Sequence, residues 1–230
     1  MDAVILAGGK GTRLQPLTDE IPKPLVKIGA QPIVQILLKR MQRCGLKRAH
    51  LAVGHQAERI RLTLGDGSHL GLEIRYSEET SPLSTVAPIK RIADLPDDFL
   101  VANGDILTDL DFRNMYEFHL QNKAKLTVAI QRRTNHVDYG VLDVDHEGQV
   151  TGFKEKPSYH LTVSMGIYVF SRSVLELVPD DRPFGFDDLM YLMLSRQEPV
   201  MTFAYDGYWL DIGRIEDYEQ AQRDIKDLSD

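Results

Sequence analysis

The sequence predicts an α/β fold of three layers, in which helices cover both faces of a mostly parallel sheet. Three observations support this prediction. Short apolar runs alternate with helical patterns, glycines or acidic residues directly follow several of those runs, and 230 residues are enough for one large core. The alternation breaks at residues 138–153, where short segments with turn residues predict an inserted β-hairpin region. We expect a single domain over residues 1–230.

The first third of the chain contains the clearest alternation of strands and helices. Its apolar residues form buried runs in the strands and recur at spacings of three and four in the helices, and glycines follow each helix. We expect, in order, a strand at 3–7, a helix at 33–44, a strand at 49–53, a helix at 57–64 and a strand at 72–76.

The remaining segments continue the pattern with longer connections. Residues 78–92 begin as a polar loop and end in a short helix, because Pro82 and Pro88 interrupt any longer one. We then expect a strand at 99–102, a helix at 112–119, a strand at 126–130, a hairpin turn at 145–148, a strand at 164–170, a helix at 184–194, a strand at 200–204, a loop at 207–213 and a terminal helix at 215–228.

Composition excludes several classes of partner. The formal net charge of −7, without runs of lysine and arginine, argues against nucleic acid as the main partner. No apolar run approaches the roughly 18 to 20 residues that cross a bilayer, so no membrane is expected. The single cysteine, Cys44, forms no internal disulfide, and the N-terminus lacks a signal pattern, which together predict a cytoplasmic protein. Cys44 ends a helical apolar series and is expected to be a small core residue.

The loop after the first strand has the composition of a phosphate-binding loop. Gly8, Gly9 and Gly11 let the backbone approach a ligand closely, and Arg13 and Lys23 would add positive charge. The spacing is neither that of a Walker P-loop nor that of a dinucleotide fingerprint. On its residues alone, the segment is therefore either a phosphate cradle or a tight turn.

Two acidic residues are candidate metal ligands. Asp105 follows the strand at 99–102 directly, where open α/β sheets bind their ligands, and Asp211 lies in the loop 207–213. Two such carboxylates could hold a Mg²⁺ ion that keeps some waters and takes other ligands from phosphate oxygens. Alternatively, each carboxylate caps a turn or helix. The charged cluster 154–156 is a solvated strand end unless it faces the same cleft.

Several motifs together resemble one family. The stretch GGKGTRLQPLTDEIPKP at residues 8–24 resembles the signature of the sugar-1-phosphate nucleotidylyltransferases, which make nucleotide sugars. The similarity continues through NGD at 103–105, YGV at 139–141, EKP at 155–157, GIYVF at 166–170 and WLDIG at 209–213. It therefore covers nearly the whole chain.

The resemblance implies a Rossmann-like sheet and assigns roles to individual residues. Residues 1–105 would bind the nucleotide and residues 106–230 the sugar, with the inserted hairpin region forming the sugar side of the cleft. The implied catalytic residues are Arg13, Lys23 and Lys156, and the implied Mg²⁺ ligands are Asp105 and Asp211. The implied sugar contacts are Gly140, Glu155 and Ser164. Relatives more usually have asparagine at the position of Ser164. The implied nucleotide-binding residues are Leu6, Ala7, Gly8, Gly9, Gly11, Thr12, Glu79, Pro82, Ser84, Thr85, Asn103 and Gly104.

The reaction implied by the resemblance is an in-line attack by a phosphate oxygen of the sugar-1-phosphate on the α-phosphorus of a nucleoside triphosphate. That oxygen is already an anion at neutral pH, so no general base is required. Catalysis would rest on alignment and on neutralisation of charge.

One loop departs from the family pattern. Where many relatives read PLGTAG, this chain reads PLSTVA at residues 82–87. Two glycines are replaced by residues with a Cβ, which disfavours positive φ and narrows the space for a base edge. We expect base choice or affinity to reflect this change.

Three readings of the function remain. The Glu78-Glu79 loop and the GYWLDIGR segment at 207–214 look most like guanylyltransferases acting on mannose- or heptose-type phosphates, with GTP as donor. Uridylyl- and thymidylyltransferases for a hexose-1-phosphate are close alternatives. A catalytically silent regulatory subunit on the same fold is the second reading, of another class, and the retained charged residues argue against it. A cytidylyl- or molybdopterin-type transferase of similar fold is the third, and the TRL and PKP elements disfavour it. With no further segment after the terminal helix, we expect a single-activity enzyme, and a homodimer.

Overall fold

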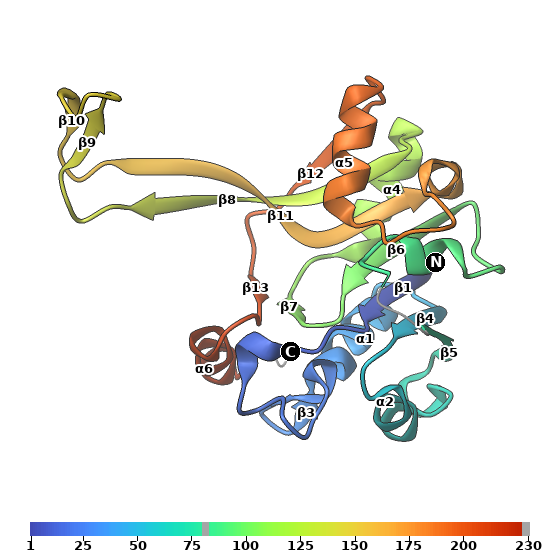
Figure 1. Ribbon diagram of the computed structural model, residues 1–230. Helices are drawn as coiled ribbons and strands as arrows, with labels where there is room; N and C mark the ends of the chain where they lie inside the picture. Colours follow the sequence, from blue (N-terminus) through green and yellow to red (C-terminus); the bar gives the residue numbers. More distant parts are fainter. Residues whose placement is uncertain (80–82, 227–230) are drawn as a thin grey trace.

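The computed structural model describes residues 1–79 and 83–226 and has a seven-stranded central sheet (Figure 1). The strands are β1 (Asp2–Ala7), β4 (Arg48–Val53), β5 (Glu73–Glu78), β6 (Asp98–Asn103), β8 (Leu126–His136), β11 (Ser158–Ser171) and β12 (Val200–Ala204). Their order in the sheet is β12-β8-β11-β6-β1-β4-β5. Strand β11 is antiparallel to β6 and β8, and the other neighbouring pairs are parallel. The predicted fold class is confirmed.

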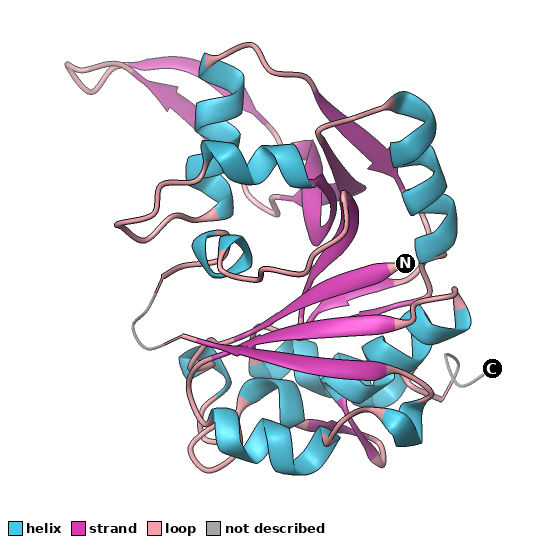
Figure 2. Ribbon diagram, turned by 90° about the vertical axis from the view of Figure 1, so that its right-hand side faces the viewer, coloured by secondary structure: helices cyan, strands magenta, loops and turns pink. Residues whose placement is uncertain are grey.

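Helices cover both faces of this sheet (Figure 2). Alternate residues of β1 point to opposite faces, so Ile5 packs in one core cluster and Val4 in another. The first cluster lies under α1 (Ile33–Arg43), α2 (Ala57–Leu64) and α4 (Phe112–Asn122). The second lies under α3 (Ala87–Lys90), the 3₁₀ helix η4 (Arg172–Leu177) and α5 (Phe186–Ser195). Cys44 is half-buried and packs against the first cluster, in agreement with its expected role.

A third, smaller cluster joins the two ends of the chain. It contains Leu14, Ile212 and Ala221, from the first loop, the segment after β13 (Trp209–Asp211) and helix α6 (Ile215–Asp224). Strand β13 pairs with β7 (Ile106–Thr108). The first loop also contains two 3₁₀ helices, η1 (Thr12–Leu14) and η2 (Lys23–Leu25). The short antiparallel pair β2 (Lys27–Ile28) and β3 (Gln31–Pro32) follows them. A third 3₁₀ helix, η3 (Ser68–Leu70), lies elsewhere, between α2 and β5.

Two helices have boundaries that differ from the expected ones. Helix α5 begins at Phe186 rather than at residue 184, because Gly185 is its N-cap and Phe184 is a buried residue of the second cluster. The terminal helix α6 ends at Asp224, so Ile225 lies just past it as the C-cap. Leu228, which the sequence predicted to belong to this helix, lies outside the described residues.

The largest departure from expectation is the arm, which we define as residues 131–163. Strand β8 runs six residues beyond the predicted end at residue 130 and pairs with the first half of β11. At the far end, β9 (Val141–Val144) and β10 (Val150–Lys154) form the predicted hairpin. This hairpin projects away from the body (Figures 1 and 2) and contributes no residue to the cleft described below, contrary to the expectation that it forms the sugar side of the cleft. In the described part of the chain, no helix is both long and apolar enough to cross a membrane.

Candidate active site

A cleft of about 690 Å³ lies at the carboxyl ends of β1, β4 and β6. Strand β1 lies between β4 and β6, and the chain crosses from one side of β1 to the other, which makes this a topological switch point of the kind where α/β sheets bind ligands. All the expected nucleotide-binding residues except Pro82 line the cleft, and Pro82 lies outside the described residues. The lining residues among them are Leu6, Ala7, Gly8, Gly9, Gly11, Thr12, Glu79, Ser84, Thr85, Asn103 and Gly104.

Gly11 holds the first loop in a shape that other residues adopt poorly. Its φ is +65°, and a Cβ there would lie 2.9 Å from the Cβ of Lys23. Its carbonyl accepts hydrogen bonds from the Leu14 amide at 2.9 Å and from the Thr18 hydroxyl at 2.8 Å. Gly11 thus fixes both the start of η1 and the place of Lys23.

We expect Gly11→Ala to lower the free energy of unfolding by about 1 to 2 kcal/mol, because the left-handed conformation penalises any side chain. The contact with Lys23 adds to this cost. Gly9→Ala is the matched control, since a Cβ at Gly9 would meet nothing within 4 Å and its φ is not positive. Urea unfolding of both variants measures the difference, and equal stabilities would contradict the constraint.

The two predicted basic residues of the loop both line the cleft, and they differ in their partners. Lys23 forms an ion pair with Oδ2 of Asp105, and both side chains are largely buried. Arg13 makes no ion pair or hydrogen bond with any described residue, and its guanidinium lies beside Gly213, whose Cβ position would be 3.7 Å away. The guanidinium of Arg13 is therefore free to bind an anion in the cleft.

Backbone pairing brings the two predicted acidic residues together. Asp211 lies opposite Ile106 in the β13–β7 pair, and the Ile212 amide donates to the Asp105 carbonyl at 3.1 Å. Burial raises the pKa of Asp211, the nearby Asp105 carboxylate raises it further, and Lys23 and Arg13 oppose these effects. Oδ1 of Asp105 is buried without a hydrogen-bond partner within the described residues.

The alternative role of Asp211 as a helix cap is not what the structure shows. The carboxylate of Asp217 accepts the amides of Gly213 and Arg214 at 3.2 and 2.9 Å and so caps α6. The Asp211 carboxylate has no hydrogen bond to a described residue, which leaves its oxygens available.

The altered loop keeps a turn that suits glycine. Ser84 has a φ of +67°, although its Cβ disfavours that conformation by about 1 to 2 kcal/mol. The loop is anchored on the segment before α5, because the amides of Val86 and Ala87 both donate to the Phe184 carbonyl at 3.0 Å. The Thr85 hydroxyl in turn accepts the Phe186 amide at 2.9 Å. Ser84 therefore strains the turn, and Ser84 and Thr85 still line the cleft.

Glu79 lies where the first loop and the altered loop meet. One oxygen, Oε2, accepts the Leu83 amide at 3.1 Å, and the other would lie 3.0 Å from a Cβ built on Gly8. Burial raises the pKa of the Glu79 carboxyl, while the Leu83 amide and then Arg91 lower it. Among the residues that the structure describes, Oε1 accepts no hydrogen bond, so Glu79 presents this oxygen to the cleft.

The remaining predicted residues lie outside this cleft. Gly140, Glu155 and Lys156 are exposed at the far end of the arm, and Ser164 lies in β11 where the arm meets the sheet. The Ser164 hydroxyl donates to the Tyr168 hydroxyl at 3.3 Å. The structure therefore gathers the nucleotide-side residues and holds Gly140, Glu155 and Lys156 away from them. Ser164 lies closer, because its partner Tyr168 lines a smaller pocket that shares Leu6, Thr85 and Asn103 with the cleft.

The cleft also contains residues that the sequence interpretation missed. His55, which the sequence interpretation did not assign to the site, is exposed and lines the cleft, and its amide donates to the Gly8 carbonyl at 3.3 Å. The available signal was its position after β4, the strand next to β1. The other missed lining residues are Lys10, Pro24, Ala52, Gly54, Leu83 and Gly213.

The chain is similar to known proteins over nearly its whole length. Residues 2–227 match the family described as nucleotidyl transferase. Mannose-1-phosphate guanylyltransferase of Mycobacterium tuberculosis is 33% identical, with 98% of this chain and 64% of that protein covered. D-glycero-alpha-D-manno-heptose 1-phosphate guanylyltransferase of Aneurinibacillus thermoaerophilus is 31% identical, with 98% and 99% covered. The crystal structure of HddC from Yersinia pseudotuberculosis complexed with GMP-PN has a TM-score of 0.74 at 29% identity and covers 97% of this chain and 99% of that one. The chain spans 60–64% of the length of the first curated relatives that it matches.

Proposed function

The chain belongs to the nucleotidyl transferase family, and on that premise we propose that it transfers a nucleoside monophosphate from GTP to a mannose- or heptose-type sugar-1-phosphate, releasing pyrophosphate. The observation that carries this proposal is the meeting of the glycine loop, Arg13, Lys23 and Asp105 in one cleft at the switch point of the sheet. A homodimer in the cytoplasm is part of the same proposal.

In this mechanism the chain contributes position and charge. The phosphate oxygen of the sugar attacks the α-phosphorus in line, and pyrophosphate leaves on the opposite side. We assign the free guanidinium of Arg13 to the leaving phosphates. Lys23 and Lys156 are assigned to the phosphates nearer the reacting bond. Since the nucleophile is already an anion, no residue needs to remove a proton from it.

The acidic residues fit a Mg²⁺ ion. Among the described residues, Asp105 has a buried oxygen without a partner and the nearby Asp211 carboxylate accepts no hydrogen bond, and carboxylate oxygens are ligands that Mg²⁺ prefers. Within residues 1–79 and 83–226, no three or more histidine, cysteine, aspartate or glutamate side chains lie close enough together to hold a metal ion by themselves. Such a partial site suits an ion that also takes phosphate oxygens from the substrate, and when bound it would neutralise charge on the reacting phosphates.

Glu79 supports guanine as the base. A carboxylate only accepts hydrogen bonds, and the Watson–Crick edge of guanine offers two adjacent donors, N1–H and the 2-amino group. Oε2 already accepts the Leu83 amide, and the other oxygen faces the cleft beside Gly8. Uracil and thymine offer a single donor flanked by acceptors, which a carboxylate matches less well.

Glu79→Gln is therefore expected to lower kcat/KM for GTP by about 10- to 100-fold, the effect of losing a hydrogen bond to a charged group. The amide oxygen of glutamine can still accept the Leu83 amide, so the loop is expected to stay in place. Glu78→Gln is the matched control, because Glu78 pairs with Arg61 on the surface at 2.8 Å. An unchanged preference among GTP, UTP and dTTP in Glu79→Gln would remove this residue from base recognition.

The decisive experiment measures pyrophosphate release. The full chain is incubated with Mg²⁺, each of several nucleoside triphosphates and a panel of sugar-1-phosphates. Release with GTP and a mannose- or heptose-type phosphate supports the proposal, and release with UTP or dTTP and a hexose-1-phosphate supports the alternative. No release from any pair would favour the silent regulatory subunit.

A further inference from the structure

The hairpin at the end of the arm, formed by β9 and β10, has an exposed apolar face. Leu142 lies opposite Phe153 and Val144 lies opposite Val150, so the four side chains share one face of the β9–β10 pair. Each is 53–62% exposed. Four neighbouring apolar side chains with this exposure form a patch of the kind that marks an interaction surface.

The body of the same chain does not cover this face. Among the described residues, none from 131 to 164 belongs to or packs against the three core clusters. The hairpin projects from the body in both ribbon views (Figures 1 and 2). An isolated two-stranded hairpin is at best marginally stable in water, so a partner on the apolar face would stabilise it.

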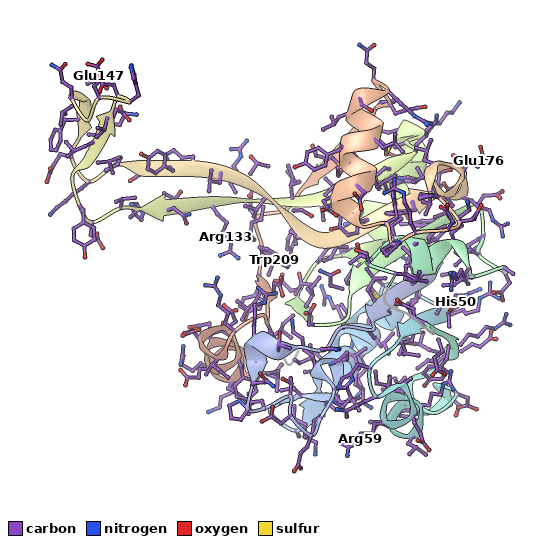
Figure 3. The ribbon with its side chains drawn as sticks, viewed as in Figure 1. His50, Arg59, Arg133, Glu147, Glu176 and Trp209 are labelled. Atoms are coloured by element: carbon purple, nitrogen blue, oxygen red, sulfur yellow. The ribbon has the colours of Figure 1, made fainter. Side chains whose placement is uncertain are left out.

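Contacts at the base of the arm fix its direction. The Gln131 side chain donates to the Gly207 carbonyl at 2.8 Å. The Arg133 guanidinium donates to the Trp209 carbonyl at 3.0 Å and lies 5.0 Å from the centroid of the indole ring (Figure 3). Trp209 itself donates to the Met165 carbonyl at 2.9 Å. A swing of the whole arm about its base would break the contacts of Gln131 and Arg133.

The end of the arm also holds Lys156, assigned above to the reacting phosphates, and Glu155, which the family resemblance assigns to the sugar. Lys156 has a φ of +43°, an uncommon conformation for a residue with a side chain, and such strain concentrates at functional sites. A Cβ on Gly140 would lie 2.6 Å from the Phe153 ring and 3.3 Å from Oε2 of Glu155. A surface that covers Phe153 would therefore also lie beside Glu155, and Lys156 is the next residue of the chain.

We propose that a second copy of this chain covers the apolar face, and that each arm delivers Glu155 and Lys156 to the cleft of the other copy. This inference rests on the proposed function for the roles of those two residues. A two-fold pair makes the exchange reciprocal, so both sites are completed by the same contact. The exchange joins the two halves of the site while the contacts of Gln131 and Arg133 stay intact.

The first test measures assembly and needs no substrate. Sedimentation of the full chain at micromolar concentration is expected to show a dimer, and the double variant Leu142→Ser with Phe153→Ser is expected to be monomeric with an unchanged circular dichroism spectrum. Tyr191→Ser is the control, since Tyr191 is 74% exposed on α5 in the body of the molecule and its loss is expected to leave the dimer intact. A monomeric wild type, or an unchanged dimer in the double variant, would overturn the proposal.

The second test asks whether the arm acts on the other copy. With Cys44 replaced by alanine, Lys156→Cys and Thr12→Cys proteins are prepared separately, mixed and oxidised. A covalent dimer that forms in the mixture and in neither protein alone supports the exchange, whereas its absence from the mixture overturns it. This readout also needs no turnover, so failure of the proposed function and failure of the arm exchange are distinguishable.

A third measurement applies once turnover is detected. Arg13→Ala has a defective cleft and Lys156→Ala a defective arm. Random pairing of the two in equal amounts places one competent site in each mixed dimer, so about a quarter of wild-type activity is expected to return. If the arm instead served its own cleft, mixing would restore none, and the exchange would be wrong.

Discussion

Replacing Asp105 by asparagine is expected to lower turnover by roughly 10³-fold, the scale of removing one preorganised electrostatic group from an active site. Asparagine has nearly the same shape but no charge, so it loses both the ion pair with Lys23 and the negative charge that the Mg²⁺ proposal requires. The fold is expected to survive, because the neighbouring backbone contact, from the Ile212 amide to the Asp105 carbonyl, does not use the side chain.

The measurement is kcat as a function of Mg²⁺ concentration, with thermal unfolding to confirm the fold. In Asp105→Asn the concentration of Mg²⁺ for half-maximal rate is expected to rise together with the fall in kcat. Asp206→Asn is the matched control, since Asp206 is an exposed carboxylate on the loop before β13 and makes no hydrogen bond or ion pair among the described residues. Full activity in Asp105→Asn would exclude Asp105 as a metal ligand.

The central fold was predictable because its signals are local. Strand β1 is a continuous apolar run, since both faces of the sheet are covered, and α1 repeats apolar residues on one side, since only that side is buried. The loops at the ends of β1 and β6 then follow from the rule that parallel strands end at one edge. This is why Gly11, Lys23 and Asp105, which the sequence placed in loops at that edge, line one cleft in the structure.

The arm was not predictable by the same means. The second half of β8, from Gln131 to His136, has mostly exposed side chains, so it lacks the alternation that marks a half-buried strand. Its extended shape depends on pairing with residues 158–163, which lie far along the chain. Sequence similarity could assign Glu155 and Lys156 to a site, but it could not say that the arm holds them away from the chain's own cleft.

The altered loop shows a different limit. From the sequence, serine in place of glycine at residue 84 was expected to disfavour a positive φ. The structure nevertheless has a positive φ at Ser84. The reason lies in partners distant in sequence, since the Phe184 carbonyl accepts two amides of the loop and the Phe186 amide donates to the Thr85 hydroxyl. Local propensity was outweighed by tertiary contacts, which no local pattern reveals.

Removing the guanidinium of Arg13 is the second change with a large expected effect. Arg13→Ala is expected to lower kcat/KM for the nucleoside triphosphate by roughly 10²- to 10³-fold, because a fixed charge that meets the leaving phosphates stabilises them most as they depart. The guanidinium faces the cleft beside Gly213 and has no competing partner among the described residues, so its whole donor set is available for the substrate. Arg13→Lys is expected to recover only part of the loss, since lysine replaces a planar fork by a point charge.

The reverse reaction separates this role from others. With nucleotide sugar and pyrophosphate as substrates, Arg13→Ala is expected to raise KM for pyrophosphate while leaving KM for the nucleotide sugar nearly unchanged. Arg59→Ala is the control, because Arg59 is an exposed arginine of α2 and lies away from the cleft (Figure 3). If KM for the nucleotide sugar rose instead, Arg13 would act on the transferred nucleotide or the sugar phosphate. Only a charge placed against the departing phosphates accounts for an effect confined to pyrophosphate.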